Sequence, residues 1–163
     1  MGNGILFIVA LASLYTLIAL GWRFQSRLRL KAQWEAGRAA LERGDVEAAS
    51  RAYAKCVGME PMWAAARSML AGSLARLGRG DEAEREARLV AEMNPRDPEG
   101  WRALCMFYAL FLPDRLDGVR AAFGEMRQLD PEAANALLRD PAMARLAPHL
   151  DSGPPPSGGG APV

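Results

Sequence analysis

A repeat of 34 residues runs through the middle of this chain. A glycine, an alanine and a proline recur at that interval: Gly44 and Gly78, Ala49 and Ala83, Pro61 and Pro95. A third copy ends at Pro131, 36 residues after Pro95, and its two additional residues fit in the segment 111–117. Units of this length cannot bury an apolar face alone and stack on their neighbours to do so. The period therefore predicts an α-solenoid of about three units.

Turn and capping signals place two helices in each copy. Gly44 and Gly78 supply a turn between the helices of the first two copies. Aspartate caps a helix and proline suits its first position, so three Asp-Pro pairs indicate helix starts: Asp97-Pro98, Asp130-Pro131 and Asp140-Pro141. We expect helices near 28–43, 46–57, 63–77, 81–93, 98–110 and 116–127. Segments 131–138 and 141–146 are expected to cap the last apolar face.

The residue types at fixed positions resemble the tetratricopeptide repeat (TPR) family, whose repeat is a 34-residue helix–turn–helix. The small-residue position of the first helix is occupied by Gly37, Ala71 and Cys105. The aromatic position of the second helix carries Tyr53 and Phe123, but copy two has Ala87 there. The resemblance covers residues 30–131. It implies an all-α fold with repeats at 30–63, 64–97 and 98–131, followed by capping helices in 132–150.

A second feature precedes the repeats. Residues 4–22 contain no charged side chain. A helix of that length spans about 28 Å, close to the bilayer core of about 30 Å. Four basic residues follow within 23–31: Arg23, Arg27, Arg29 and Lys31. We therefore predict a transmembrane helix at 4–22, a short N-terminal end at 1–3 and a basic juxtamembrane segment at 23–31. No proline interrupts residues 5–43, so this helix is expected to continue into the first repeat.

Loop charges set the expected topology. Positive residues lie only after the span, which predicts an N-terminus outside and repeats in the cytoplasm, with a periplasmic repeat domain as the alternative. A cleaved signal peptide is disfavoured because no basic residue precedes the apolar run. Tyr15 and Trp22 are expected at the span and its interface, and Ala12 and Ala19 in a seam against other spans. The Ala- and Arg-rich composition is typical of bacteria, which indicates the inner membrane.

Composition excludes several functions. The net charge is +1, which gives no argument for nucleic acid binding. One histidine, two cysteines and no nucleophile, phosphate or metal motif predict a protein without catalytic residues, cofactor, metal or small-molecule substrate. Cys56 and Cys105 lie in different repeats and are expected to remain unpaired. The acidic run at 81–86 is interpreted as a solvated helix face, and the Pro/Gly-rich tail 151–163 as disordered.

The family resemblance also implies a site. First helices in this family line a groove that binds peptides or partner helices. Carried over by position, the groove residues are Trp34, Arg38, Leu41, Arg76, Arg102, Met106 and Leu110. Three arginines beside an apolar strip suit an acidic, amphipathic partner segment, unless they are only a solvated surface. The family's carboxylate clamp uses paired Asn and Lys, and no Asn occupies these positions, so a chaperone-tail clamp is not expected.

Two functions follow from this organisation. The first is a membrane-anchored adaptor that recruits or assembles protein partners at a bacterial inner membrane. The alternative is a structural accessory subunit that is built permanently into a larger membrane complex through its span and its repeats. Salt-sensitive partner binding favours the adaptor, and fixed-ratio co-purification through salt washes favours the subunit.

Overall fold

The computed structural model describes residues 2–150; the side chains of residues 2–13 and of Arg23 lie outside that description. Across this range the regular structure is helical, and no strand occurs in it. The chain divides into two compact units, Met1–Pro61 and Met62–Val163. Each unit is described by itself below.

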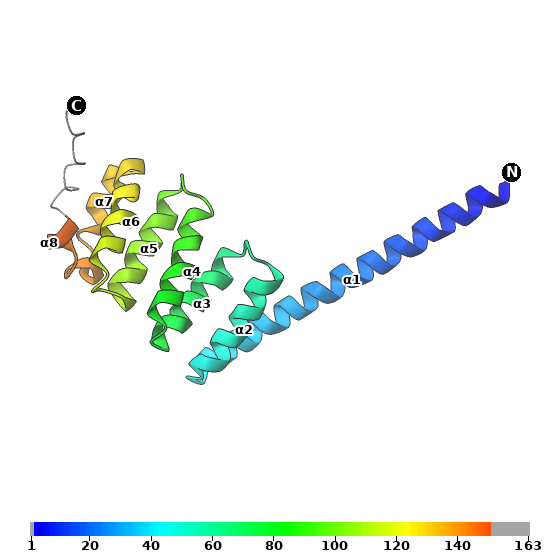
Figure 1. Cartoon of the computed structure of the whole chain (residues 1–163), viewed down its shortest axis with the longest axis horizontal. Helices are drawn as coiled ribbons and strands as arrows, with labels where there is room; N and C mark the ends of the chain where they lie inside the picture. Colours follow the sequence, from blue (N-terminus) through cyan, green and yellow to red (C-terminus); the bar gives the residue numbers. More distant parts are fainter. Residues whose placement is uncertain (1, 151–163) are drawn as a thin grey trace, which may run out of the picture. The chain divides into compact units, whose positions relative to one another are not determined.

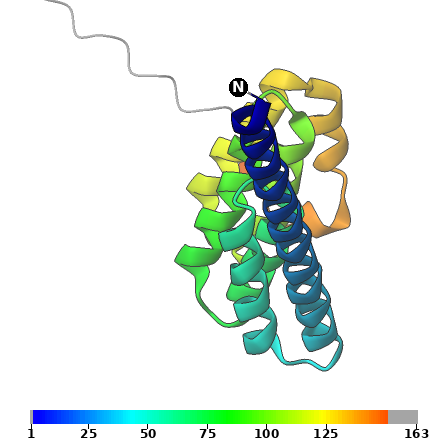
Figure 2. The same cartoon turned by 90° about the vertical axis from the view of Figure 1, so that its right-hand side faces the viewer.

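The first unit consists of two helices, α1 (Gly2–Glu42) and α2 (Val46–Met59). Helix α1 is a single unbroken element, as the absence of proline predicts, and α2 lies along its C-terminal end (Figures 1 and 2). Gly44 adopts a left-handed backbone with φ of +77°, which glycine accepts without steric cost. The Asp45 side chain accepts a hydrogen bond of 2.8 Å from the Ala48 N–H and so caps α2.

The predicted membrane span falls on α1. No helix in the part of the chain searched, the described residues, is long and apolar enough to cross a bilayer. Residues 4–13 of the predicted span, including Ala12, have side chains outside the described set, as does Arg23. The predicted tail 151–163 also lies outside the described residues.

A glycine brings the two helices of the first unit together. A Cβ added to Gly37 would stand 2.7 Å from the Tyr53 ring, so only a residue without a side chain leaves room there. The ring of Tyr53 is fully buried and meets Trp34 edge-on, with ring centroids 5.4 Å apart. Cys56 of α2 is buried in the same interface. The small first-helix residue and the aromatic second-helix residue therefore pack as a pair.

The second unit contains two helix pairs and a cap. The pairs are α3 (Ala64–Arg76) with α4 (Gly80–Glu92) and α5 (Pro98–Phe111) with α6 (Leu116–Leu129). The cap follows as α7 (Pro131–Leu137), the 3₁₀ turn η1 (Pro141–Met143) and α8 (Ala147–Leu150). The Asp97, Asp130 and Asp140 side chains each accept a backbone N–H at a helix start, with proline following, as predicted.

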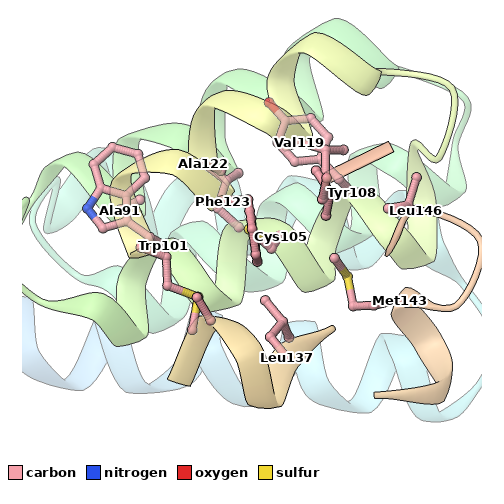
Figure 3. Close-up of a cluster of buried hydrophobic side chains, with 14 of the residues drawn as sticks. Ala91, Trp101, Cys105, Tyr108, Val119, Ala122, Phe123, Leu137, Met143 and Leu146 are labelled. Carbon is pink, nitrogen blue, oxygen red and sulfur yellow. The ribbon is translucent and has the colours of Figure 1, made fainter. Parts of the chain in front are cut away.

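The core of the second unit lies between α5, α6 and the cap. Figure 3 shows Tyr108 and Cys105 of α5 close to Val119 and Phe123 of α6, Trp101 beside Ala91 of α4, and cap side chains closing the cluster. Burial raises the pKa of the Cys105 thiol to about 12, so this cysteine stays protonated and acts as a small apolar residue. Cys56 and Cys105 are both free, as expected.

The second part of the cap contains a tighter turn. Segment 141–146, which is expected to cap the last apolar face, begins with the 3₁₀ turn Pro141–Met143, and α8 begins at Ala147. Side chains at i and i+3 stand in line in 3₁₀ geometry. This places Met143 and Leu146 together, and both are buried against α5 and α6. The Leu146 N–H also donates a 2.8 Å hydrogen bond to the Met143 carbonyl, so the chain stays tightly turned up to the start of α8.

Candidate peptide-binding surface

Helices α3 and α5 are the first helices of the two repeats in the second unit, and they lie side by side. The Phe111 ring lies 3.9 Å from the position of a Gly72 Cβ, and Phe107 and Phe111 stack with centroids 5.3 Å apart. We define the α3–α5 surface by its outward residues on these two helices. They are Ser68, Gly72, Arg76, Arg102, Met106 and Leu110.

Three residues of α5 form one stripe on this surface. Arg102, Met106 and Leu110 follow each other at four-residue spacing, which places them on the same helix face. The Leu110 side chain is 62 % exposed, although it is large and apolar. Met106 is half-buried and packs against the core of the unit. The stripe therefore offers an accessible apolar side chain on a rigid helix.

Two of the three arginines in the expected positive stripe have acidic neighbours. The Arg102 guanidinium donates hydrogen bonds of 2.8 and 2.6 Å to Glu99, and these bonds lower the pKa of that carboxyl. Arg38 forms a looser pair of 3.9 Å with Glu35, one turn earlier on α1. Arg76 makes no ion pair with any described residue. Acidic side chains one helical turn away therefore balance the charges of Arg38 and Arg102.

The remaining predicted groove residues belong to the other unit. Trp34, Arg38 and Leu41 lie on the C-terminal part of α1. Trp34 is half-buried against Tyr53, so much of its ring belongs to the repeat core. The predicted groove residues therefore form two separate groups. Arg76, Arg102, Met106 and Leu110 lie together in the second unit, and Trp34, Arg38 and Leu41 lie on α1 in the first unit.

The described residues predicted for the membrane anchor all lie on α1. Tyr15 and Trp22 are strongly exposed, and Arg27 and Arg29 also face solvent. Ala19 is half-exposed. Large apolar side chains along residues 14–28 are exposed as well, namely Leu14, Leu17, Ile18, Leu20, Phe24 and Leu28. This part of the helix carries apolar surface that the described chain does not cover.

A polar network that the sequence did not predict joins α4, α5 and α6. The Tyr108 hydroxyl donates a 2.7 Å hydrogen bond to Glu84 and accepts one of 3.0 Å from Arg88. Arg88 also pairs with Glu84 at 3.1 Å. Arg115, in the segment lengthened by two residues, pairs with Asp81 and lies 3.6 Å from Glu84. Part of the acidic run at 81–86 therefore holds helices together, rather than forming only a solvated face.

The buried tyrosines Tyr53 and Tyr108 differ in their hydroxyl groups. Burial and the bond to Glu84 raise the pKa of Tyr108 above its ordinary value, so its hydroxyl remains a donor. The Tyr53 hydroxyl is buried and makes no hydrogen bond with any described residue. An unsatisfied buried polar group costs about 1–3 kcal/mol.

We expect Tyr53→Phe to leave the free energy of unfolding unchanged or to raise it by about 1 kcal/mol, because it removes an unsatisfied hydroxyl. The matched change Tyr108→Phe should lower it by about 1.5–3 kcal/mol, because it removes bonds to charged partners. Chemical denaturation of both variants measures the difference. Equal losses would contradict this account.

The comparisons with known proteins agree with this geometry. Residues 40–105 match the sequence profile described as "Tetratricopeptide repeat". This part of the chain is therefore similar in sequence to the tetratricopeptide repeat. No curated protein matches the chain.

Solved structures of TPR domains have the same fold. The first TPR of Spaghetti (RPAP3), bound to the HSP90 peptide SRMEEVD, is similar with a TM-score of 0.56 and 16 % identity, over 77 % of this chain and 93 % of that one. The TPR2B domain of yeast Sti1 in complex with pHsp70 gives 0.54 and 18 %, over 76 % and 97 %. The first TPR domain of human RPAP3 gives 0.53 and 19 %, over 76 % and 96 %. At these identities the similarity establishes the all-α, TPR-like fold.

Proposed function

We propose that this protein is a non-enzymatic scaffold that is held at a membrane by α1 and recruits protein partners through the α3–α5 surface. The observation that carries the proposal is the apolar stripe of the half-buried Met106 and the exposed Leu110 on a first helix of a TPR-like fold. Apolar anchors at four-residue spacing are a common way of binding peptide segments. The surrounding repeat packing holds these side chains in place.

The partner is proposed to be an amphipathic segment with acidic residues. Leu110 and Met106 offer apolar contacts, and Arg76 on the neighbouring helix, which forms no ion pair within the described part of the chain, offers a charge. The RPAP3 domain of the same fold is bound to an HSP90 peptide, and the Sti1 domain is in complex with pHsp70. This chain lacks the Asn and Lys pair of the carboxylate clamp, so its affinity would come from side chains within the segment rather than from a C-terminal carboxylate.

The anchor is proposed to be the N-terminal part of α1 in a bacterial inner membrane. The exposed apolar side chains of residues 14–28 and the basic residues Arg27 and Arg29 support this. The basic residues follow the apolar stretch in the sequence. This order favours an N-terminus outside and a cytoplasmic repeat domain, with a periplasmic repeat domain as the alternative. Because α1 continues without a break from Gly2 to Glu42, the first repeat would be attached to the membrane without a flexible linker.

A permanent structural subunit is the second candidate. Ala19 and Gly21 leave little side-chain bulk on this part of α1, and a Cβ at Gly21 would meet no atom of a described residue within 4 Å. Small residues of this kind allow close packing between membrane helices. In this case α1, rather than the α3–α5 surface, would carry the main contact.

Co-purification separates the two candidates. The tagged full-length chain is purified from membranes in mild detergent, before and after a high-salt wash, and the retained proteins are identified. A soluble partner that is lost in salt supports the adaptor. A fixed-ratio set of membrane proteins that survives the wash supports the structural subunit. Recovery of no partner under either condition would contradict both.

A charge placed on the apolar stripe provides a sharper test. We expect Leu110→Glu to weaken partner retention at least about tenfold, because it removes an exposed apolar anchor and repels acidic residues. Leu89→Glu is the matched control, since Leu89 on α4 is also a partly exposed leucine but lies outside the surface. Equal retention by the two variants would remove the α3–α5 surface from the proposal.

A further inference from the structure

A small apolar cavity lies between α3, α4 and α5 in the second unit. Its volume is about 120 Å³. The residues that line it are Ser68, Ala71, Ala87, Val90, Gly100, Ala103, Leu104 and Phe107. Most of these side chains are small, and Ser68 supplies the only hydroxyl in the lining.

The cavity has an identifiable cause in the sequence. Ala87 occupies the second-helix position at which the neighbouring repeats carry Tyr53 and Phe123. Those two aromatic rings are buried and fill the space between the helices of their own repeats. In the second repeat the ring is missing, and Ala71 on the facing helix is also small. Interiors are otherwise packed with few voids larger than a water molecule, so this one is unusual.

The opening of the cavity lies on the α3–α5 surface. Ser68 and Ala103 are exposed although both line the cavity, whereas Ala71, Ala87 and Leu104 at its inner end are buried. Ser68 shares one face of α3 with Gly72 and Arg76, at four-residue spacing. A segment that lies along this surface would therefore pass over the opening.

We propose that this cavity receives one large apolar side chain of the bound partner, from a segment that also carries acidic residues. The inference rests on the proposed function and specifies the partner of the same surface. Size supports it, because an apolar cavity of about 150 Å³ accepts a benzene molecule and one of 120 Å³ suits a leucine side chain. Charge supports it as well, because Arg76 lies on the same face of α3 and forms no ion pair with a described residue.

Two synthetic peptides test the proposal. Both are short, glutamate-rich and fluorescently labelled, and they differ only in a central leucine or alanine. Binding to the full-length chain is measured by fluorescence anisotropy. The leucine peptide should bind at least about tenfold more tightly, because a pocket built for the side chain loses its apolar contacts with alanine. Equal binding of the two peptides, or no binding of either, overturns the proposal.

Two variants test whether the preference for the leucine peptide arises at the cavity. Ala87→Leu is expected to fold, since larger side chains occupy the equivalent position in the other repeats, and to abolish the preference for the leucine peptide. Ser68→Trp blocks the exposed opening and should have the same effect without changing the interior. Arg85→Leu is the matched control, because it adds a leucine to an exposed position of the same helix. Preserved discrimination in both cavity variants would overturn the assignment.

The co-purification experiment distinguishes this inference from the function on which it depends. If Leu110→Glu abolishes partner retention and the peptides show no preference for leucine, the surface binds partners and the cavity does not contribute. If Leu110→Glu and Leu89→Glu retain partners equally, the proposed surface itself fails.

Discussion

Gly37→Ala should destabilise the first repeat by about 1–3 kcal/mol, the usual cost of adding a methyl group to a filled interior. The new Cβ would stand 2.7 Å from the Tyr53 ring and 2.8 Å from the carbon that carries its hydroxyl. The ring cannot move freely, because it is fully buried and meets Trp34 on one side. Chemical denaturation monitored by circular dichroism and tryptophan fluorescence measures the loss.

A control and a rescue make this expectation specific. Gly58→Ala adds the same methyl group to α2, where nothing lies within 4 Å, and should cause no loss. Combining Gly37→Ala with Tyr53→Leu should cost less than the sum of the two single changes, since the shorter side chain leaves room for the Cβ. Additive costs would mean that the ring contact does not determine the requirement for glycine.

The same pair shows how far the sequence specified the fold. The family resemblance assigns Gly37 to a small position and Tyr53 to an aromatic position, and the structure places them in contact. Asp97 and Asp130 each precede a proline, which predicts helix caps, and in the structure both side chains accept a backbone N–H at a helix start. Periodicity and capping depend on residues close in sequence or at fixed intervals, so a single sequence reveals them.

The features that the sequence did not specify depend on side-chain rotamers and tertiary distance. Arg102 was predicted to face a partner, but its geometry allows two hydrogen bonds to Glu99 one turn away. Glu84 was assigned to a solvated run, yet Tyr108 reaches it from a helix in the next repeat. Ala87 was visible as a departure from the repeat pattern. Only the three-dimensional structure shows that the absence of an aromatic ring at position 87 leaves a cavity with an opening at the surface.

The network around Tyr108 also has a steric requirement, which gives the largest effect that we expect. Gly118 on α6 faces the Tyr108 hydroxyl, and a Cβ there would overlap the hydroxyl oxygen and stand 2.6 Å from the ring carbon that carries it. Moving the ring would break its hydrogen bonds to Glu84 and Arg88. Gly118→Ala should therefore lower the free energy of unfolding by roughly 3 kcal/mol, from overpacking together with lost bonds to charged groups.

Gly124→Ala is the control for that change, because it lies on the same helix with nothing within 4 Å of its added Cβ. Removing a glycine from a helix interior should stabilise this variant by about 0.5–1 kcal/mol. In a Tyr108→Leu background, which shortens the side chain, Gly118→Ala should cost far less than in the parent chain. If its cost is the same in both backgrounds, the glycine is required for backbone reasons, and the Tyr108 hydroxyl does not explain its presence.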